Sequence, residues 1–221
     1  MGILTLEHSD RLFWLGRYTE RVYTSAKQYA RSFDDMIDHQ ADSYMTLCRQ
    51  LDIPNIYADK SDFLTRFCFD ETDPNSIAAN LLRAYDNAIV LREEIGSEPL
   101  SYIQLAVYEM SKARLSQAPL IELQRMADDI LAFWGIVDDL IESENARNII
   151  KTGKRVERLD LYGRLHASKR SMLREIHRLQ GRLPKTCLPF AQKKLDALET
   201  YLEGDEPNWR ELVQAVDTLV G

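Results

Sequence analysis

Residues 12–29, LFWLGRYTERVYTSAKQY, carry the pattern that decides the fold. Apolar or small side chains recur here in steps of three and four, and the same spacing continues to Met36. The positions are Leu12, Leu15, Thr19, Val22, Ala26, Tyr29, Phe33 and Met36. This spacing places one continuous stripe on a helix, which buries the stripe against a neighbour. We therefore predict a long helix that begins after Ser9 or Asp10 and ends near His39.

A second copy of this pattern lies 137 positions further along the chain. Gly16-Arg17-Tyr18-Thr19-Glu20-Arg21 is echoed by Gly153-Lys154-Arg155-Val156-Glu157-Arg158. The stripe is echoed as well, at Ile149, Thr152, Val156, Leu159, Gly163 and His166. Agreement of both motif and stripe predicts an internal pseudo-repeat, either a duplication or two segments with paired structural roles.

The motif suits a close contact between two helices. Glycine costs a helix interior about 1 kcal/mol relative to alanine, but it lets another backbone or a ligand approach. Buried charges need partners. If the two helices pack together, Glu20 can pair with Arg158 or Lys154, and Glu157 with Arg21 or Arg17. Either these pairs fix the register of the helices, or the cluster also binds an anionic substrate.

The rest of the chain is also rich in helix signals, and strand patterns are nearly absent. Asp73-Pro74 is typical of a helix start and Gly96 of a helix end. Further helices are predicted at 42–51, 61–69, 74–96, 98–116, 119–142, 144–181, 187–203 and 207–219. Because the connections are short, we predict an all-α, single-domain antiparallel bundle of about seven to nine helices over residues 1–221.

Composition limits the class of protein. Hydrophobic residues make up 45% of the chain and no long apolar run occurs, so we expect a folded protein without a membrane span. The start shows no secretory signal, and the three cysteines are few and far apart. We therefore expect a cytoplasmic location, with Cys48, Cys68 and Cys187 as small buried residues.

The charge is unevenly distributed. The net charge of −7 argues against nucleic-acid binding, but residues 147–185 hold twelve basic and only three acidic side chains. The basic residues are Arg147, Lys151, Lys154, Arg155, Arg158, Arg164, Lys169, Arg170, Arg174, Arg178, Arg182 and Lys185. Either this segment balances acidic helices within the protein, or it forms a surface for a phosphate-bearing ligand or an acidic protein.

Known catalytic motifs are missing from the sequence. There is no phosphate-binding glycine-rich loop, no serine nucleophile elbow and no zinc helix, so we predict no cofactor and no metal. His166 is expected to be a packing histidine. Glu20 and Glu157 are the candidate catalytic acid or base, and Arg17, Arg21, Lys154 and Arg158 would bind substrate. An arginine partner lowers a carboxyl pKa, however, which suits a structural role better than general-acid catalysis.

These residues resemble the alpha-E family, predicted all-helical bacterial proteins named for a Glu-Arg motif. The resemblance rests on Trp14-Leu15-Gly16-Arg17-Tyr18 with Glu20-Arg21, and on residues 153–160. Asn87-Ala88, Arg92-Glu93, Ile95 and Ser97-Glu98 resemble the central segment of the family. The chain is shorter than typical members, and Ile89 stands where an arginine is expected.

The resemblance implies a functional setting. Alpha-E proteins are associated with circularly permuted ATP-grasp proteins, which form amide or peptide bonds at the expense of ATP. The implied function is a component of such a system that binds the ligase or its peptide or small-molecule substrate through the Arg/Glu cluster. One alternative is an enzyme that acts on the product and uses Asn87 and Arg92 as well. The other is a helical scaffold held by ion pairs, which leaves a homo-oligomer open.

Overall fold

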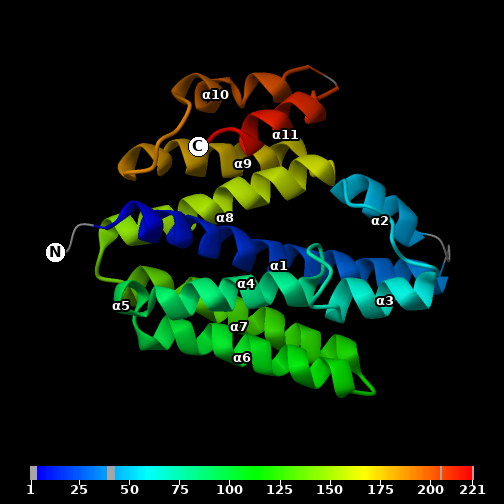
Figure 1. The fold of residues 1–221 in the computed structure, drawn as a ribbon. Coiled ribbons are helices and arrows are strands. Elements are labelled where there is room, and N and C mark those ends of the chain that lie inside the picture. The colour runs from blue at the N-terminus through cyan, green and yellow to red at the C-terminus, as the bar shows by residue number, and fades with distance from the viewer. Residues whose placement is uncertain (1–3, 39–42, 205, 221) are drawn as a thin grey trace. The chain divides into compact units, whose positions relative to one another are not determined.

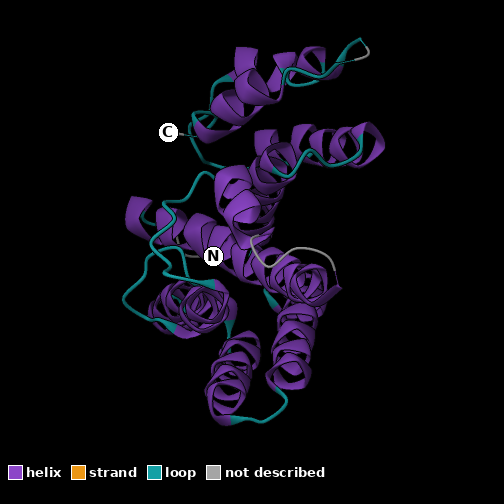
Figure 2. Ribbon diagram, turned by 90° about the vertical axis from the view of Figure 1, so that its right-hand side faces the viewer, coloured by secondary structure: helices purple, strands orange, loops and turns teal. Residues whose placement is uncertain are grey.

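The computed structural model describes residues 4–38, 43–204 and 206–220. The predicted all-α class is confirmed, and the described residues contain no β-strand (Figure 2). Their α-helices are α1 (Leu6–Asp38), α2 (Ser43–Leu51), α3 (Lys60–Phe69), α4 (Ile77–Val90), α5 (Arg92–Ile95), α6 (Ser97–Leu115), α7 (Pro119–Leu140), α8 (Glu144–Arg164), α9 (Lys169–Gln180), α10 (Gln192–Ala197) and α11 (Trp209–Asp217). These eleven exceed the expected seven to nine because two of the predicted helices are each divided into two. The segment predicted over 74–96 forms α4 and the short α5, and the segment predicted over 144–181 forms α8 and α9.

The helix predicted over 74–96 begins later than expected and is interrupted. Ser76, not Asp73, caps α4, and its side chain accepts a hydrogen bond from the backbone of Ala79. Asp73 instead accepts hydrogen bonds from the backbone of Asn75 and from the hydroxyl of Tyr57. Gly96 does end the segment, in the left-handed conformation that favours glycine, with φ of 85°.

The helix predicted over 144–181 is divided into α8 and α9. His166 breaks it with a left-handed φ of 50°, and Ser168 caps the new helix by accepting from the backbone of Ser171. The expectation that His166 packs in the core is wrong. Its side chain is exposed and stacks on Trp209, with ring centroids 5.2 Å apart. This long-range contact supports a backbone conformation that the local sequence does not favour.

The described chain divides into two compact units. Unit 1 comprises residues 1–17 and 143–221, and unit 2 comprises residues 18–142, so α1 contributes to both. In unit 1, α8 packs against both α9 and α11 (Figure 1). In unit 2, α6 and α7 form an antiparallel pair, with α4 packed against α6 (Figure 1). The assignment of residues 1–221 to a single domain stays a prediction.

The two motif helices cross at their glycines, as the sequence predicts, and both glycines belong to unit 1. A β-carbon on Gly16 would overlap the carbonyl oxygen of Ile150, and one on Gly153 would overlap that of Phe13. The contact is reciprocal, because Phe13 and Ile150 stand three positions before the respective glycines. The backbones of α1 and α8 therefore approach to a distance that no other residue type permits.

The predicted stripes are buried on both helices. Leu12, Leu15 and Val22 are fully buried on α1, as are Ile149 and Leu159 on α8. Each such side chain contributes about 1.5–3 kcal/mol through the apolar surface it removes from water. The stripe of α8 ends at Gly163, where a β-carbon would lie 2.7 Å from Val213 of α11. The burial pattern thus agrees with the predicted echo up to the exposed His166.

Unit 2 has an aromatic core around Phe63. This fully buried ring stacks on Tyr44 at 5.2 Å and on Phe67 at 5.0 Å, and the edge of Tyr57 meets it at 5.0 Å. The hydroxyl of Tyr57 donates to Asp73 over 2.8 Å, which satisfies the polar end of a buried ring. The core thereby joins α2 and α3 to the turn that precedes α4.

Replacing either crossing glycine by alanine should destabilise the protein strongly. Gly16→Ala and Gly153→Ala each place a methyl group against a backbone carbonyl that cannot move aside like a side chain. We expect the free energy of unfolding to fall by about 2 kcal/mol or more. Gly135→Ala on α7 is the control, since a β-carbon there meets nothing within 4 Å. It should raise stability by up to about 1 kcal/mol. Urea unfolding followed by circular dichroism measures all three, and equal effects would contradict the crossing.

Candidate functional site

The crossing positions one of the predicted ion pairs. The Nε atom of Arg17 on α1 donates to Oε2 of Glu157 on α8 over 2.7 Å. Glu157 is completely buried and Arg17 is 9% exposed. The guanidinium also lies over the ring of Trp14, 5.0 Å from its centroid. A buried carboxylate without such a partner would cost several kcal/mol, so this pair ties the register of the two helices to the glycine contact.

The ion pair continues into a larger network of unit 1. Asp160, two positions after the Glu-Arg pair of α8, accepts from Nε of Arg164 over 2.7 Å. Arg164 also donates to Oδ2 of Asp217 on α11 over 3.2 Å. The other oxygen of Asp217, Oδ1, lies 4.0 Å from Nη2 of Arg17. Two arginines and three carboxylates thus join α1, α8 and α11.

Asp160 is the carboxyl group of this network with an unusual pKa. Burial raises its pKa to about 6, and the negative charges of Glu157 and Asp217 add to the effect, while Arg164 opposes it. Its side chain is only 4% exposed. Asp160 is buried beside two other acids, so a bound proton relieves both the cost of burying its charge and the repulsion from these acids.

A cavity of about 570 Å³ opens beside this network, entirely within unit 1. Arg17 and Asp217 line it together with mostly apolar side chains. The lining is Leu4, Leu6, Ser9, Asp10, Phe13, Trp14, Arg17, Cys187, Leu188, Pro189, Asp217 and Val220. Cys187 is exposed, so the expectation that all three cysteines are buried is wrong for this one, whereas Cys48 and Cys68 are buried.

A second charged cluster surrounds Glu175 on α9, also within unit 1. Glu175 is completely buried, and four arginines place a side-chain nitrogen within 4 Å of its carboxylate. Arg178 donates over 2.9 Å, and Arg155 of α8 donates to the other oxygen. Arg174 and Arg158 lie at 3.6 Å and 3.9 Å. We call these five residues the Glu175 cluster; with Glu175 ionised it carries a net charge of +3.

Burial and neighbouring cations lower the pKa values of two basic groups at the Glu175 cluster. Lys151 has its pKa lowered to about 8 by burial and by the charges of Arg182 and Arg155. Burial is also the main reason that the pKa of Arg155 is lowered, and Arg158 and Arg178 reinforce it against Glu175. Both basic groups therefore lie in a partly buried environment in which neighbouring cations repel one another.

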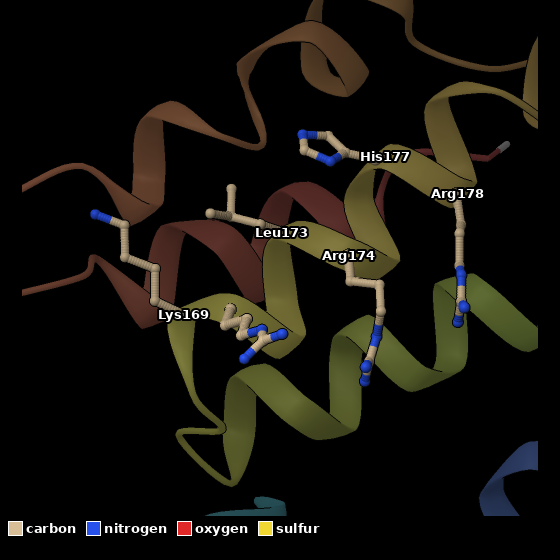
Figure 3. A pocket seen from close by; sticks show the side chains of 6 residues that line it. Lys169, Leu173, Arg174, His177 and Arg178 are labelled. Carbon is tan, nitrogen blue, oxygen red and sulfur yellow. The ribbon is translucent and has the colours of Figure 1, made fainter.

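The exposed side of α9 carries more basic residues. A hollow of about 690 Å³ lies over this helix, lined by Lys169, Arg170, Leu173, Arg174, His177 and Arg178. Figure 3 shows Arg174 and Arg178 directed from α9 toward α8, whereas His177 and Leu173 lie on the other side of the helix. Both arginines are about half exposed, so they contact Glu175 and solvent at once.

The structure brings some of the predicted site residues together. Arg17 and Glu157 form the ion pair described above, and the backbone nitrogen of Lys154 lies at the glycine crossing. Arg158 reaches the Glu175 cluster. Glu175 itself escaped the sequence reasoning because it is one acid within a strongly basic segment. Its position on α9, three residues before Arg178, is the local signal that could have identified it.

The remaining predicted residues belong to unit 2. Glu20 is completely buried and accepts from the hydroxyl of Thr24 over 3.0 Å. Arg21 is half-buried on α1, and Asn87 is buried on α4. Arg92 is exposed and its guanidinium donates to the hydroxyl of Ser97 over 3.3 Å. The predicted partners of Glu20 and Arg21 stay predictions.

The described residues offer neither a candidate metal site nor a candidate membrane span. Residues 4–38, 43–204 and 206–220 contain no group of three or more His, Cys, Asp or Glu side chains that could hold a metal ion. Within the same residues, no helix combines the length and apolar character needed to cross a membrane.

Fold and site together define an all-helical domain built around paired Glu-Arg helices. The chain belongs to the Alpha-E family, described as a predicted alpha-helical domain with a conserved ER motif, whose model matches residues 8–219. The sequence contains two Glu-Arg pairs, Glu20-Arg21 and Glu157-Arg158, one in each copy of the repeat. Comparisons with curated proteins and with solved structures gave no match.

The raised pKa of Asp160 predicts a specific pH dependence of stability. The folded protein holds this proton to about pH 6, whereas the unfolded chain loses it near pH 4, so this group makes stability fall as pH rises between these values. Asp160→Asn removes the effect. Relative to wild type, the variant should gain about 2 kcal/mol between pH 4 and pH 7. Urea unfolding at several pH values measures the difference. The exposed Asp86→Asn is the control and should give none; a flat difference for Asp160→Asn would refute the assignment.

Proposed function

We propose that this chain is the non-ATPase component of an ATP-grasp-linked system that forms amide or peptide bonds in the bacterial cytoplasm. In this role it binds the acidic surface of its ligase partner, or an anionic substrate, through the Glu175 cluster and the adjoining basic face of α9. The ATP-grasp setting is supported by the resemblance of the Glu-Arg motifs. The small number of separated cysteines supports the cytoplasm.

The charge of the Glu175 cluster is the single observation that carries the binding site. Glu175 lies within 4 Å of all four guanidiniums, so a ligand would not have to order these long side chains itself. Arginine binds carboxylates and phosphates through two parallel hydrogen bonds. The half-exposed Arg174 and Arg178 are the members that can reach a ligand while they remain near Glu175.

The Arg17–Glu157 pair supports a structural role for the motif instead. Glu157 is completely buried and bonded to Arg17, so it is poorly placed to transfer protons with a substrate. We therefore propose that the glycines, Arg17 and Glu157 hold α1 against α8. The second motif helix, α8, then supplies Arg155 and Arg158 to the binding site.

The proposal predicts which variants lose the partner. Arg174→Gln and Arg178→Gln together remove two exposed charges but leave Arg155 to pair with Glu175. We expect the double variant to bind the proposed ATP-grasp ligase partner about tenfold or more weakly than the wild type does. Wild-type binding should weaken steeply with added salt, and the variant should lose most of that dependence. Co-elution and calorimetric titration at two salt concentrations measure both.

A matched control separates binding from folding. Arg210→Gln on α11 removes an exposed arginine elsewhere in unit 1 and should leave affinity unchanged. The melting temperature of the double variant should stay within a few degrees of wild type. If wild-type chain and ATP-grasp protein do not co-elute, and ligase turnover is the same without this chain, the proposed function is wrong. If they bind but the double variant binds equally well, the site is wrong.

A further inference from the structure

The cavity beside the Arg17–Glu157 pair has the size and lining of a small-molecule site. Its volume of about 570 Å³ falls within the range typical of ligand pockets, about 300–1,000 Å³. Phe13, Trp14 and Leu188 contribute apolar surface, while Arg17 and Asp217 contribute opposite charges. A few charged groups in a mostly apolar cavity are the usual arrangement for fixing the polar end of a ligand.

Arg17 keeps donors available for such a ligand. Only its Nε atom hydrogen-bonds to a described residue, Glu157, so the two terminal nitrogens retain their donors. The residue is nonetheless 91% buried, given its exposure of 9%. The nearest oxygen of Asp217 lies 4.0 Å from Nη2, which is beyond hydrogen-bonding distance. The terminal nitrogens of Arg17 do not belong to the fully buried polar atoms that lack a partner, so these donors are open to solvent and to a ligand in the cavity.

The charges together select the head group. A simple carboxylate would satisfy Arg17 but would also meet Asp217 and the exposed Asp10 on the cavity wall. A simple ammonium would satisfy the aspartates and meet Arg17. An α-amino acid carries both charges on one carbon. Its carboxylate and ammonium therefore match a guanidinium and a carboxylate that stand 4.0 Å apart.

We infer that this cavity binds a free α-amino acid with an apolar side chain. The carboxylate accepts from the terminal nitrogens of Arg17, the ammonium donates to Oδ1 of Asp217, and the side chain packs on Trp14 and Leu188. A peptide fits less well, because its two terminal charges are further apart. The binding site does not depend on the proposed function, but a role of the amino acid as a substrate for amide formation rests on it.

Three ligands of one shape test the head group. L-Leucine carries both charges, L-leucinamide lacks the carboxylate, and 4-methylpentanoate lacks the ammonium. Calorimetric titration of the purified chain should show saturable binding of L-leucine, with each of the other two at least about tenfold weaker. If none of the three binds at millimolar concentration, the inference is overturned. If 4-methylpentanoate binds as well as L-leucine, the role of Asp217 is wrong.

Two variants test the location. Asp217→Asn should weaken L-leucine about tenfold, because the ammonium loses its partner, and should strengthen 4-methylpentanoate, because the carboxylate loses a repelling neighbour. Val220→Trp fills the cavity from its rim and should abolish binding of all three ligands. Glu211→Gln, on the same helix as Asp217 but outside the cavity, is the control. Binding of L-leucine that survives Val220→Trp would place the amino acid elsewhere.

The same variants keep the two proposals separable. The double variant Arg174→Gln and Arg178→Gln should lose the ATP-grasp partner and still bind L-leucine, since neither arginine lines the cavity. Asp217→Asn should lose L-leucine and still bind the partner. If L-leucine does not bind but the complex with the partner forms, only the cavity site is overturned. If the complex with the partner does not form but L-leucine binds, only the proposed function is overturned.

Discussion

The close contact between Gly16 and Gly153 is the constraint on which unit 1 depends. Both glycines lie inside helices, where glycine reduces stability relative to alanine, and each faces a backbone carbonyl of the opposite helix. With the backbones this close, Arg17 reaches Glu157 directly, and a completely buried carboxylate becomes tolerable. Packing and electrostatics therefore support each other. The short distance makes the ion pair, and the cost of breaking a buried pair opposes any slip of one helix along the other.

The basic residues of unit 1 fall into two groups that differ in how far they are neutralised. Arg17 and Arg164 lie among three carboxylates that compensate their charges, and burial together with the repulsion from Glu157 and Asp217 raises the pKa of Asp160. The four arginines around Glu175 lie within 4 Å of its carboxylate, and burial together with the charges of Arg182 and Arg155 lowers the pKa of the nearby Lys151. The first group holds helices together and has no net positive charge, so it suits a ligand that carries both charges better than a simple anion. The second retains attraction for an anion, which is why we place the proposed binding surface there.

Much of this architecture could be predicted from the sequence, because its causes are local or repeated. The stripe from Leu12 onward and its echo from Ile149 gave the helices and their buried faces. The glycine motif gave the crossing and one of its ion pairs. The break at His166 could not be predicted, because residues 165–167 contain no glycine or proline and the turn is supported by stacking on the distant Trp209. The role of Asp217 was hidden for the same reason, since its arginine partners lie far away in sequence.

The arrangement of charges also bears on whether this chain catalyses a reaction. A general acid or base needs a group that can exchange protons with a substrate, and Glu157 is completely buried with its carboxylate bonded to Arg17. Asp160 has a more suitable pKa of about 6, but it is nearly inaccessible and is bonded to Arg164. The groups that face the cavity and solvent, chiefly Arg17, Asp217, Arg174 and Arg178, are charged donors and acceptors suited to holding a ligand. The cavity and the exposed arginines of unit 1 are therefore better suited to holding a ligand than to transferring a proton, which agrees with the binding role that we propose.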